Sequence, residues 1–152
     1  MRTKKLTIAL WCIVLTASVC AQSTVDKTRE KAENAKPSDC AKVCFEAARQ
    51  LIEASNQLYS GGDAVQGLKL MNDAVRYAKR GTEASIESRK NEKNAEIALR
   101  KMAKRMHEVG QSLALEDRDP VFKAEDQLDD LRDKMLATLF GNPKSSFEEK
   151  KK

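Results

Sequence analysis

The stretch that decides the fold is residues 51–78, LIEASNQLYSGGDAVQGLKLMNDAVRYA. Apolar or small residues recur there every three or four positions on both sides of a Gly-Gly turn, which is the spacing of one buried helix face. The first face begins before the quoted stretch and consists of Cys44, Ala47, Leu51, Ala54 and Leu58. The second face follows the turn and consists of Ala64, Leu68, Met71, Val75 and Ala78. Gly61 and Gly62 are expected to end the first helix and Asp63 to begin the second. The stretch therefore predicts a helical hairpin.

A charged segment follows this hairpin and leaves the course of the chain open. Within residues 80–94 the apolar stripe almost disappears. Gly81, Asn91 and Asn94 could each break a helix there, but an uninterrupted helix is equally compatible with so charged a segment. The apolar spacing then resumes at Ala95, Leu99, Met102, Met106, Val109 and Leu113. Residues 63–114 can therefore form one long helix or two.

Capping residues mark the outer limits of the helical region. Ser38 can cap the first helix, and Asp119 can cap the last one with Pro120 at its first position. The last helix carries its apolar face on Val121, Ala124, Leu128, Leu131, Met135 and Leu139. Gly141 is expected to end it. Because such faces must pack on one another, we predict an all-α fold, a small antiparallel helical bundle or helical-hairpin array of three to four helices.

The first residues have the features of an export signal. Arg2, Lys4 and Lys5 stand before residues 6–19, an uncharged and mostly apolar run. A charged start and a short apolar run are typical of a secretory signal. The 14-residue run is too short for a membrane-spanning helix, which takes about 20 residues. We therefore expect an exported protein without a stable membrane span.

The residues after this run indicate where the signal is removed. Val19 and Ala21 place small residues where signal peptidase reads them, so cleavage is expected between Ala21 and Gln22. In the alternative, the protein is a lipoprotein in which Cys20 is lipidated and becomes the new N-terminus. We predict a periplasmic or secreted protein, with anchoring through Cys20 as the alternative.

Removal of the signal changes the composition on which functional inferences depend. The remaining 131 residues suffice for one domain with a modest core. The net charge falls from +5 to +2, because 25 basic residues then stand against 23 acidic ones. A nearly neutral chain without Trp is unlike a nucleic-acid binder. The expected organisation is a cleaved signal over 1–21, a flexible leader over 22–37, a helical domain over 38–141 and a disordered charged tail over 142–152.

Residues 51–78 resemble a single tetratricopeptide repeat. In that family a helix ends in Gly-Asp, and a second helix then places small or apolar residues at fixed offsets. The matching residues here are Gly62-Asp63 at the turn, followed by Gly67-Leu68, Met71 and Ala74-Val75. Lys79 stands where the closing proline of the repeat would fall, and no second copy of the pattern follows. The resemblance implies a helical scaffold that binds protein or peptide in a groove, and it implies no chemistry.

Cys40 and Cys44 are the two cysteines left after cleavage at Ala21. At this spacing in a helix their β-carbons lie about 5 to 6 Å apart, whereas a relaxed disulfide needs about 3.5 to 4.5 Å. A local disulfide therefore requires a distorted first turn. An intermolecular disulfide, a redox or metal role and simple packed thiols are the alternatives. Two thiols without a nearby histidine make a poor zinc site, so we predict no metal or cofactor.

The other candidate residues give no catalytic constellation. His107, the only histidine, falls beside an apolar helix face and is expected to be a half-exposed surface residue. No Ser, Cys or carboxylate can be paired with it from sequence. Residues 76–105 have a net charge of +6, and residues 116–133 have a net charge of −5. Either the two segments lie near each other or face water, or the basic one binds an anionic surface.

We therefore expect a non-enzymatic helical interaction or scaffold protein of the cell envelope or a secreted one, which binds another protein. The expected partner groove lies near Leu58, Tyr59 and Tyr77. The alternatives are a thiol redox or metal-handling protein that uses Cys40 and Cys44, and a periplasmic bundle that binds anionic surfaces. The identity of the partner and the oligomeric state stay open.

Overall fold

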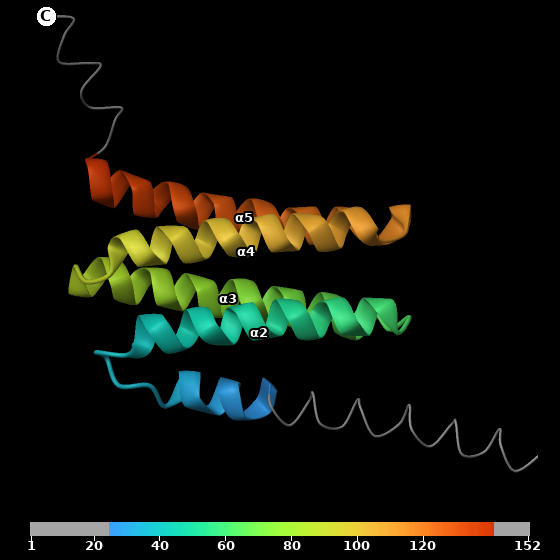
Figure 1. The fold of residues 1–152 in the computed structure, drawn as a ribbon, viewed down its shortest axis with the longest axis horizontal. Helices are drawn as coiled ribbons and strands as arrows, with labels where there is room; N and C mark the ends of the chain where they lie inside the picture. The colour runs from blue at the N-terminus through green and yellow to red at the C-terminus, as the bar shows by residue number, and fades with distance from the viewer. Residues whose placement is uncertain (1–24, 142–152) are drawn as a thin grey trace, which may run out of the picture.

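The chain forms two helical hairpins that pack on one another (Figure 1). This computed structural model describes residues 25–141. The first hairpin consists of α2 (Cys40–Ser60) and α3 (Ala64–Ser88), and the second of α4 (Glu92–Ser112) and α5 (Leu115–Phe140). Successive helices run antiparallel, so α2 and α4 point in the same direction. The expected all-α class is confirmed.

The number of helices is one higher than the upper end of our prediction. Residues 25–33 are helical as well, in the part of the chain where we expected a flexible leader or a frayed helix. Val25 and Ala32 of this segment are buried. Arg29 pairs with Asp73 of α3. The segment is therefore packed on the first hairpin, and the structure describes five helices in residues 25–141.

The turn between α2 and α3 is built as the sequence predicts. Gly62 has φ of +84°, a conformation that glycine adopts without strain. The Asp63 side chain then caps α3 by accepting a hydrogen bond of 3.1 Å from the backbone N–H of Gln66. Further along, the ring of Tyr59 lies against Gly67. The hydroxyl of Ser55 donates to the Gly67 carbonyl at 2.6 Å, so the two helices approach closely here.

The chain breaks between α3 and α4, so residues 63–114 form two helices. Arg89 and Asn91 both have positive φ, of 52° and 60°. Asparagine tolerates this left-handed conformation better than most residues. Asn91 is therefore the break among the three candidates, whereas Gly81 and Asn94 lie inside α3 and α4.

The start of α5 differs from our prediction. The helix begins at Leu115, and Pro120 lies inside it rather than at its first position. The guanidinium of Arg118 donates to the carbonyls of Leu113 at 2.9 Å and Gln111 at 3.2 Å, which holds the end of α4 against the start of α5. Because Pro120 has no N–H, α5 lacks one backbone hydrogen bond, the one that residue 120 would donate to the Glu116 carbonyl. Gly141, with φ of +71°, ends α5 as expected.

The core lies within and between the hairpins and is formed by the predicted apolar faces. The large side chains with no exposed surface are Met71, Leu99, Met106, Leu128 and Met135. The outermost predicted positions, Leu58, Ala64, Leu68 and Leu113, are only partly buried. In residues 25–141 no helix combines the length and the hydropathy needed to cross a bilayer.

The contact between Gly67 and Tyr59 gives a stability prediction. A β-carbon at position 67 would lie 2.9 Å from Cδ2 and 3.1 Å from Cγ of the Tyr59 ring. Gly67→Ala should therefore lower the free energy of unfolding by about 1 kcal/mol, because overpacking outweighs the better helix propensity of alanine. In a Tyr59→Ala background the same change should stabilise the protein. Urea denaturation of the four variants measures both effects, and stabilisation in both backgrounds would contradict the prediction.

Candidate functional site

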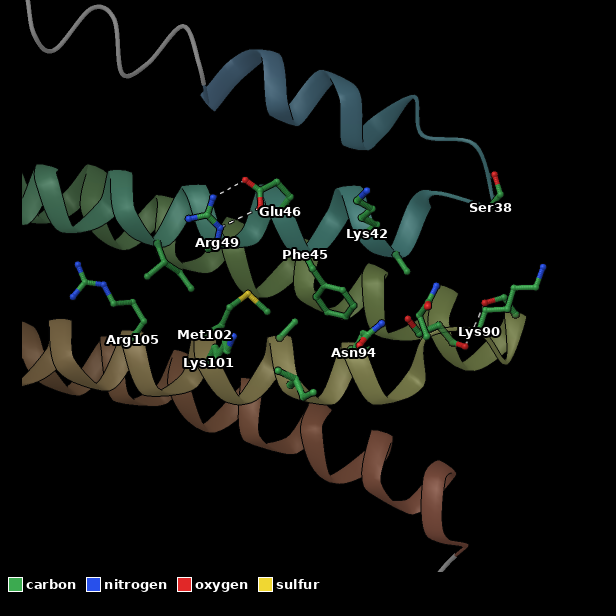
Figure 2. Close-up of a pocket in the computed structure, with 18 of the residues that line it drawn as sticks. Ser38, Lys42, Phe45, Glu46, Arg49, Lys90, Asn94, Lys101, Met102 and Arg105 are labelled. Atoms are coloured by element: carbon green, nitrogen blue, oxygen red, sulfur yellow. Dashed lines mark hydrogen bonds and ion pairs between the residues drawn. The ribbon is translucent and has the colours of Figure 1, made fainter.

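A cavity of about 840 Å³ lies between α2 and α4 (Figure 2), and we call it the α2–α4 groove. The end of α3 and the turn before α4 close one end of it. Its floor is apolar, and its rim carries charged side chains that are partly or fully exposed to solvent. The floor residues are Ala41, Phe45, Ile52, Ala95, Ala98 and Met102.

The groove exists because the two helices that line it belong to different hairpins. α2 packs mainly on α3, and α4 mainly on α5, so α2 and α4 touch each other less. Three of the floor positions, Ala41, Ala95 and Ala98, carry methyl side chains, which are too small to fill the space between the helices. Of the larger floor side chains, Ile52 and Met102 are nearly fully buried, and Phe45 is partly buried against the core. The floor is thus continuous with the core.

Two ion pairs neutralise part of the rim. Arg105 of α4 donates from Nε and Nη2 to the two carboxylate oxygens of Glu53 of α2, both at 2.8 Å. This bidentate pair joins the two walls of the groove. Hydrogen bonding from Arg105 is the main cause that lowers the pKa of Glu53. Within α2, Arg49 pairs with Glu46 at 2.6 Å, as Figure 2 shows.

Three lysines on the rim leave the groove with a positive charge. Lys42, Lys90 and Lys101 are exposed and line the groove. None of their amino groups forms an ion pair or hydrogen bond with another residue between 25 and 141. Since each of the two ion pairs has no net charge, the three lysines set the charge of the groove.

Ser85 of α3 also lines the groove and lacks a hydrogen-bond partner. Its side chain is fully buried, and its Oγ makes no hydrogen bond within the described residues. Buried hydroxyl groups in proteins almost always have a partner. An unsatisfied buried hydroxyl group therefore lies next to the groove, at the end closed by α3.

Cys40 and Cys44 lie in the first turns of α2, and both are buried thiols. Their sulfur atoms are 3.8 Å apart, which is a hydrogen-bond contact, whereas a disulfide bond would be about 2.05 Å long. Burial is the largest cause that raises the pKa of Cys44 from 9.0 to about 12, and the neighbouring Cys40 adds to it. Neither cysteine lines the groove.

The residues for which we expected a partner groove do not share a surface. Tyr77 is 2% exposed, and its hydroxyl donates at 3.1 Å to Glu33, the last residue of the 25–33 helical segment. Tyr59 and Leu58 are partly buried near the turn between α2 and α3. Tyr77 therefore cannot contribute an exposed contact, and none of the three residues lines the α2–α4 groove. The expected cleavage site, Ala21 and Gln22, and the alternative anchor Cys20 lie outside the described residues.

His107 is about half exposed and contacts three side chains. Its Nδ1 lies 3.0 Å from an oxygen of Glu125 on α5, and its Nε2 lies 2.8 Å from the Gln111 amide. The ring packs beside that of Phe122 at 5.5 Å between centroids. The structure thus supplies a carboxylate partner that the sequence could not assign. Residues 25–141 contain no group of three or more His, Cys, Asp or Glu side chains arranged to hold a metal ion.

Sequence reasoning missed the groove, although one signal for it was present. Ala41, Phe45 and Ile52 recur at spacings of four and seven, which gives α2 a second apolar stripe beside the one that faces α3. A second stripe indicates a second contact surface on the same helix. The gap between α2 and α4 depends on how the hairpins pack, and no local pattern encodes it.

The burial of Cys44 gives a prediction about thiol reactivity. Because its pKa is about 12 rather than 9.0, its thiolate at pH 8 is about a thousandfold rarer than that of an ordinary thiol. In the native protein, iodoacetamide should therefore leave Cys44 unmodified at pH 8, whereas it should modify Cys44 readily in urea. Mass spectrometry of tryptic peptides follows the reaction, and a Cys44→Ala variant assigns the signal. Equal rates in the native and unfolded protein would contradict the prediction.

Comparisons with protein-family models, curated proteins and solved structures found no match to this chain.

Proposed function

We propose that this protein is a non-enzymatic scaffold that binds another protein through the α2–α4 groove. The observation that carries the proposal is the apolar floor, where Phe45 and Met102 lie between two parallel helices. An elongated apolar groove between helices, rimmed by charged residues, is the kind of surface on which an amphipathic helix docks. The groove contains no cluster of nucleophile, base and orienting group of the kind that hydrolytic chemistry requires.

The length of the groove supports a helical partner. On α4 the lining extends from Asn94 to Arg105, which corresponds to about 17 Å of helix axis at about 1.5 Å per residue. On α2 it extends over a similar length, from Ala41 to Glu53. A partner helix of about three turns would contact both walls along this length.

The resemblance of residues 51–78 to a tetratricopeptide repeat supports the same proposal. That resemblance implies a scaffold of helical hairpins that binds a protein or peptide in a groove. α2 and α4 are the first helices of the two hairpins, and together they line most of the groove. We further propose that the protein works outside the cytoplasm, because its first 21 residues have the pattern of an export signal.

The alternative of thiol redox or metal chemistry has less support. Cys40 and Cys44 are both buried, and the raised pKa of Cys44 disfavours the reactive thiolate. A groove for a partner protein would use the apolar floor and the unpaired lysines, whereas a thiol site would use only two buried cysteines.

A photo-crosslinker in the groove tests the proposal in intact cells that produce the protein. We expect benzoylphenylalanine in place of Ala98 to give one discrete crosslinked product with a partner. The same substitution at Ala137 of α5, which is also partly buried but lies outside the groove, is the matched control and should give no such product. Crosslinks at neither position, or the same product at both, would contradict the proposed function.

A groove-filling variant provides the second test. Ala98→Phe should reduce partner recovery at least about tenfold, because its ring occupies space that the partner needs. Ala137→Phe adds the same ring elsewhere and should leave recovery unchanged. The melting temperature of both variants, followed by circular dichroism, shows whether the fold is intact. Undiminished recovery with a folded Ala98→Phe variant would contradict a role for the groove.

A further inference from the structure

We infer that the groove accepts an amphipathic helix with an acidic C-terminal end, and that this helix lies antiparallel to α2 and α4. The inference rests on the proposed function and adds the chemistry and direction of the partner. It follows from three features of the groove: its apolar floor, the uneven distribution of charge along its length, and the shared direction of its walls.

The uneven charge comes from the unpaired lysines. Lys42 lies in the first turn of α2, and Lys90 lies in the turn before α4, so both are at the same end of the groove. Toward the other end the cation of Arg105 is cancelled by its bidentate pair with Glu53. Lys101 lies one turn from Arg105 on α4, well away from Lys90. The unpaired lysine charge is therefore +2 at the end with Lys42 and Lys90 and +1 toward the other end.

The direction of the walls adds to the same end. α2 and α4 both begin where Lys42 and Lys90 lie, and a helix carries partial positive charge at its N-terminus. α3 ends there with partial negative charge, so one of the two positive helix ends is left uncompensated. The residues before the two helices, Asp39 and Asn91, make no side-chain hydrogen bond to the first turn. Asp39 and Glu92 carry as many negative charges near this end as Lys42 and Lys90 carry positive ones. Only the two lysines line the groove, however, so the surface that a ligand meets at this end is positive.

The unsatisfied hydroxyl of Ser85 is an independent sign that this end is built for a polar group. Ser85 lies in the last turn of α3, beside the start of α2 and α4. Ser85 is among the residues that line the groove, and its buried Oγ lacks a partner among the described residues. A hydroxyl can donate to a carboxylate or to the free carbonyls at the end of a bound helix.

These features fix the direction of a bound helix. The C-terminus of a helix carries partial negative charge and up to four unpaired carbonyls. Placed at the positive end, it would lie against Lys42 and Lys90 with Ser85 beneath it. The bound helix then runs antiparallel to α2 and α4, so its negative C-terminus lies next to their positive N-termini. Acidic side chains in its last turn pair with the lysines, while its apolar face covers Phe45 and Met102.

Charge also argues against the chain's own C-terminal segment as the occupant. Residues 142–152 contain four lysines against two glutamates, so their net charge of +2 has the same sign as the groove. An acidic partner is the occupant that complements the lysines.

Synthetic peptides of about fourteen residues, long enough for four helical turns, test the inference on the full chain. All carry leucines at the same positions of one helix face. The first has glutamates in its last turn, the second has the same glutamates in its first turn, and the third has lysines in its last turn. By fluorescence anisotropy, the first should bind about tenfold more tightly than the second, because both the lysines and the helix ends favour it. The third should bind most weakly.

Charge reversal assigns the preference to the named residues. The double substitution Lys42→Glu and Lys90→Glu should abolish the preference for the first peptide. Lys69→Glu with Lys79→Glu, on the exposed side of α3, is the matched control and should preserve it. Equal binding of the first two peptides, or a preference that survives reversal of Lys42 and Lys90, would overturn the inference.

The two proposals fail in different ways. If position 98 crosslinks a partner but the peptides show no preference in direction, the scaffold function stands and the inferred helix direction is wrong. If position 98 gives no crosslink and Ala98→Phe leaves peptide binding unchanged, the groove is not the binding site, and both proposals fail.

Discussion

The rest of the structure depends on the close packing of α2 against α3. Small residues make this approach possible: a β-carbon on Gly81 would lie 3.3 Å from the carbonyl oxygen of Ala41 and from Cβ of Cys44. α3 also contacts α4 and α5, so it is the helix on which both hairpins assemble. α2 packs far more extensively on α3 than on α4, and alanines line the space between α2 and α4. The groove is thus left where the two hairpins meet.

Local patterns predicted most of the fold, because helices in this chain are specified by short-range features. The apolar spacing predicted the buried faces of all four long helices but left open whether α3 and α4 form one helix, and Gly62, Asp63 and Gly141 marked three of the helix limits. The start of α5 was missed because it depends on Arg118, whose side chain reaches back to carbonyls of α4. The packed segment at 25–33 was missed because its contacts are with residues more than twenty positions away, such as the ion pair between Arg29 and Asp73.

The candidate site was harder to predict than the fold, for the same reason. A core face needs only one helix to be recognised, whereas a groove needs two helices that fail to fill the space between them. The alanines at 41, 95 and 98 do not indicate a groove in the sequence, because their role depends on α2 and α4 lying side by side. Segment charges were also a poor guide. Residues 76–105 are basic overall and residues 116–133 are acidic overall. The ion pair between them joins Arg132 of the acidic segment to Glu96 of the basic segment at 2.9 Å. Lys90 and Lys101 of the basic segment stay unpaired within residues 25–141.

The position of Phe45 next to Cys44 connects the stability of the fold to the shape of the groove. Cys44 is fully buried in the core, and Phe45, one residue later, points into the groove from the same turn of α2. The bidentate pair of Glu53 and Arg105 holds the other end of the two walls together. In the proposed complex both walls are already held by contacts within the fold, so binding would not have to order them, and the entropic cost of association would be lower. The lysines are long and exposed, so their amino groups would have the reach to meet the carboxylates of the proposed partner. A floor that is continuous with the core and a rim of exposed lysines would select the proposed partner by the arrangement of its apolar residues first and by its charge second.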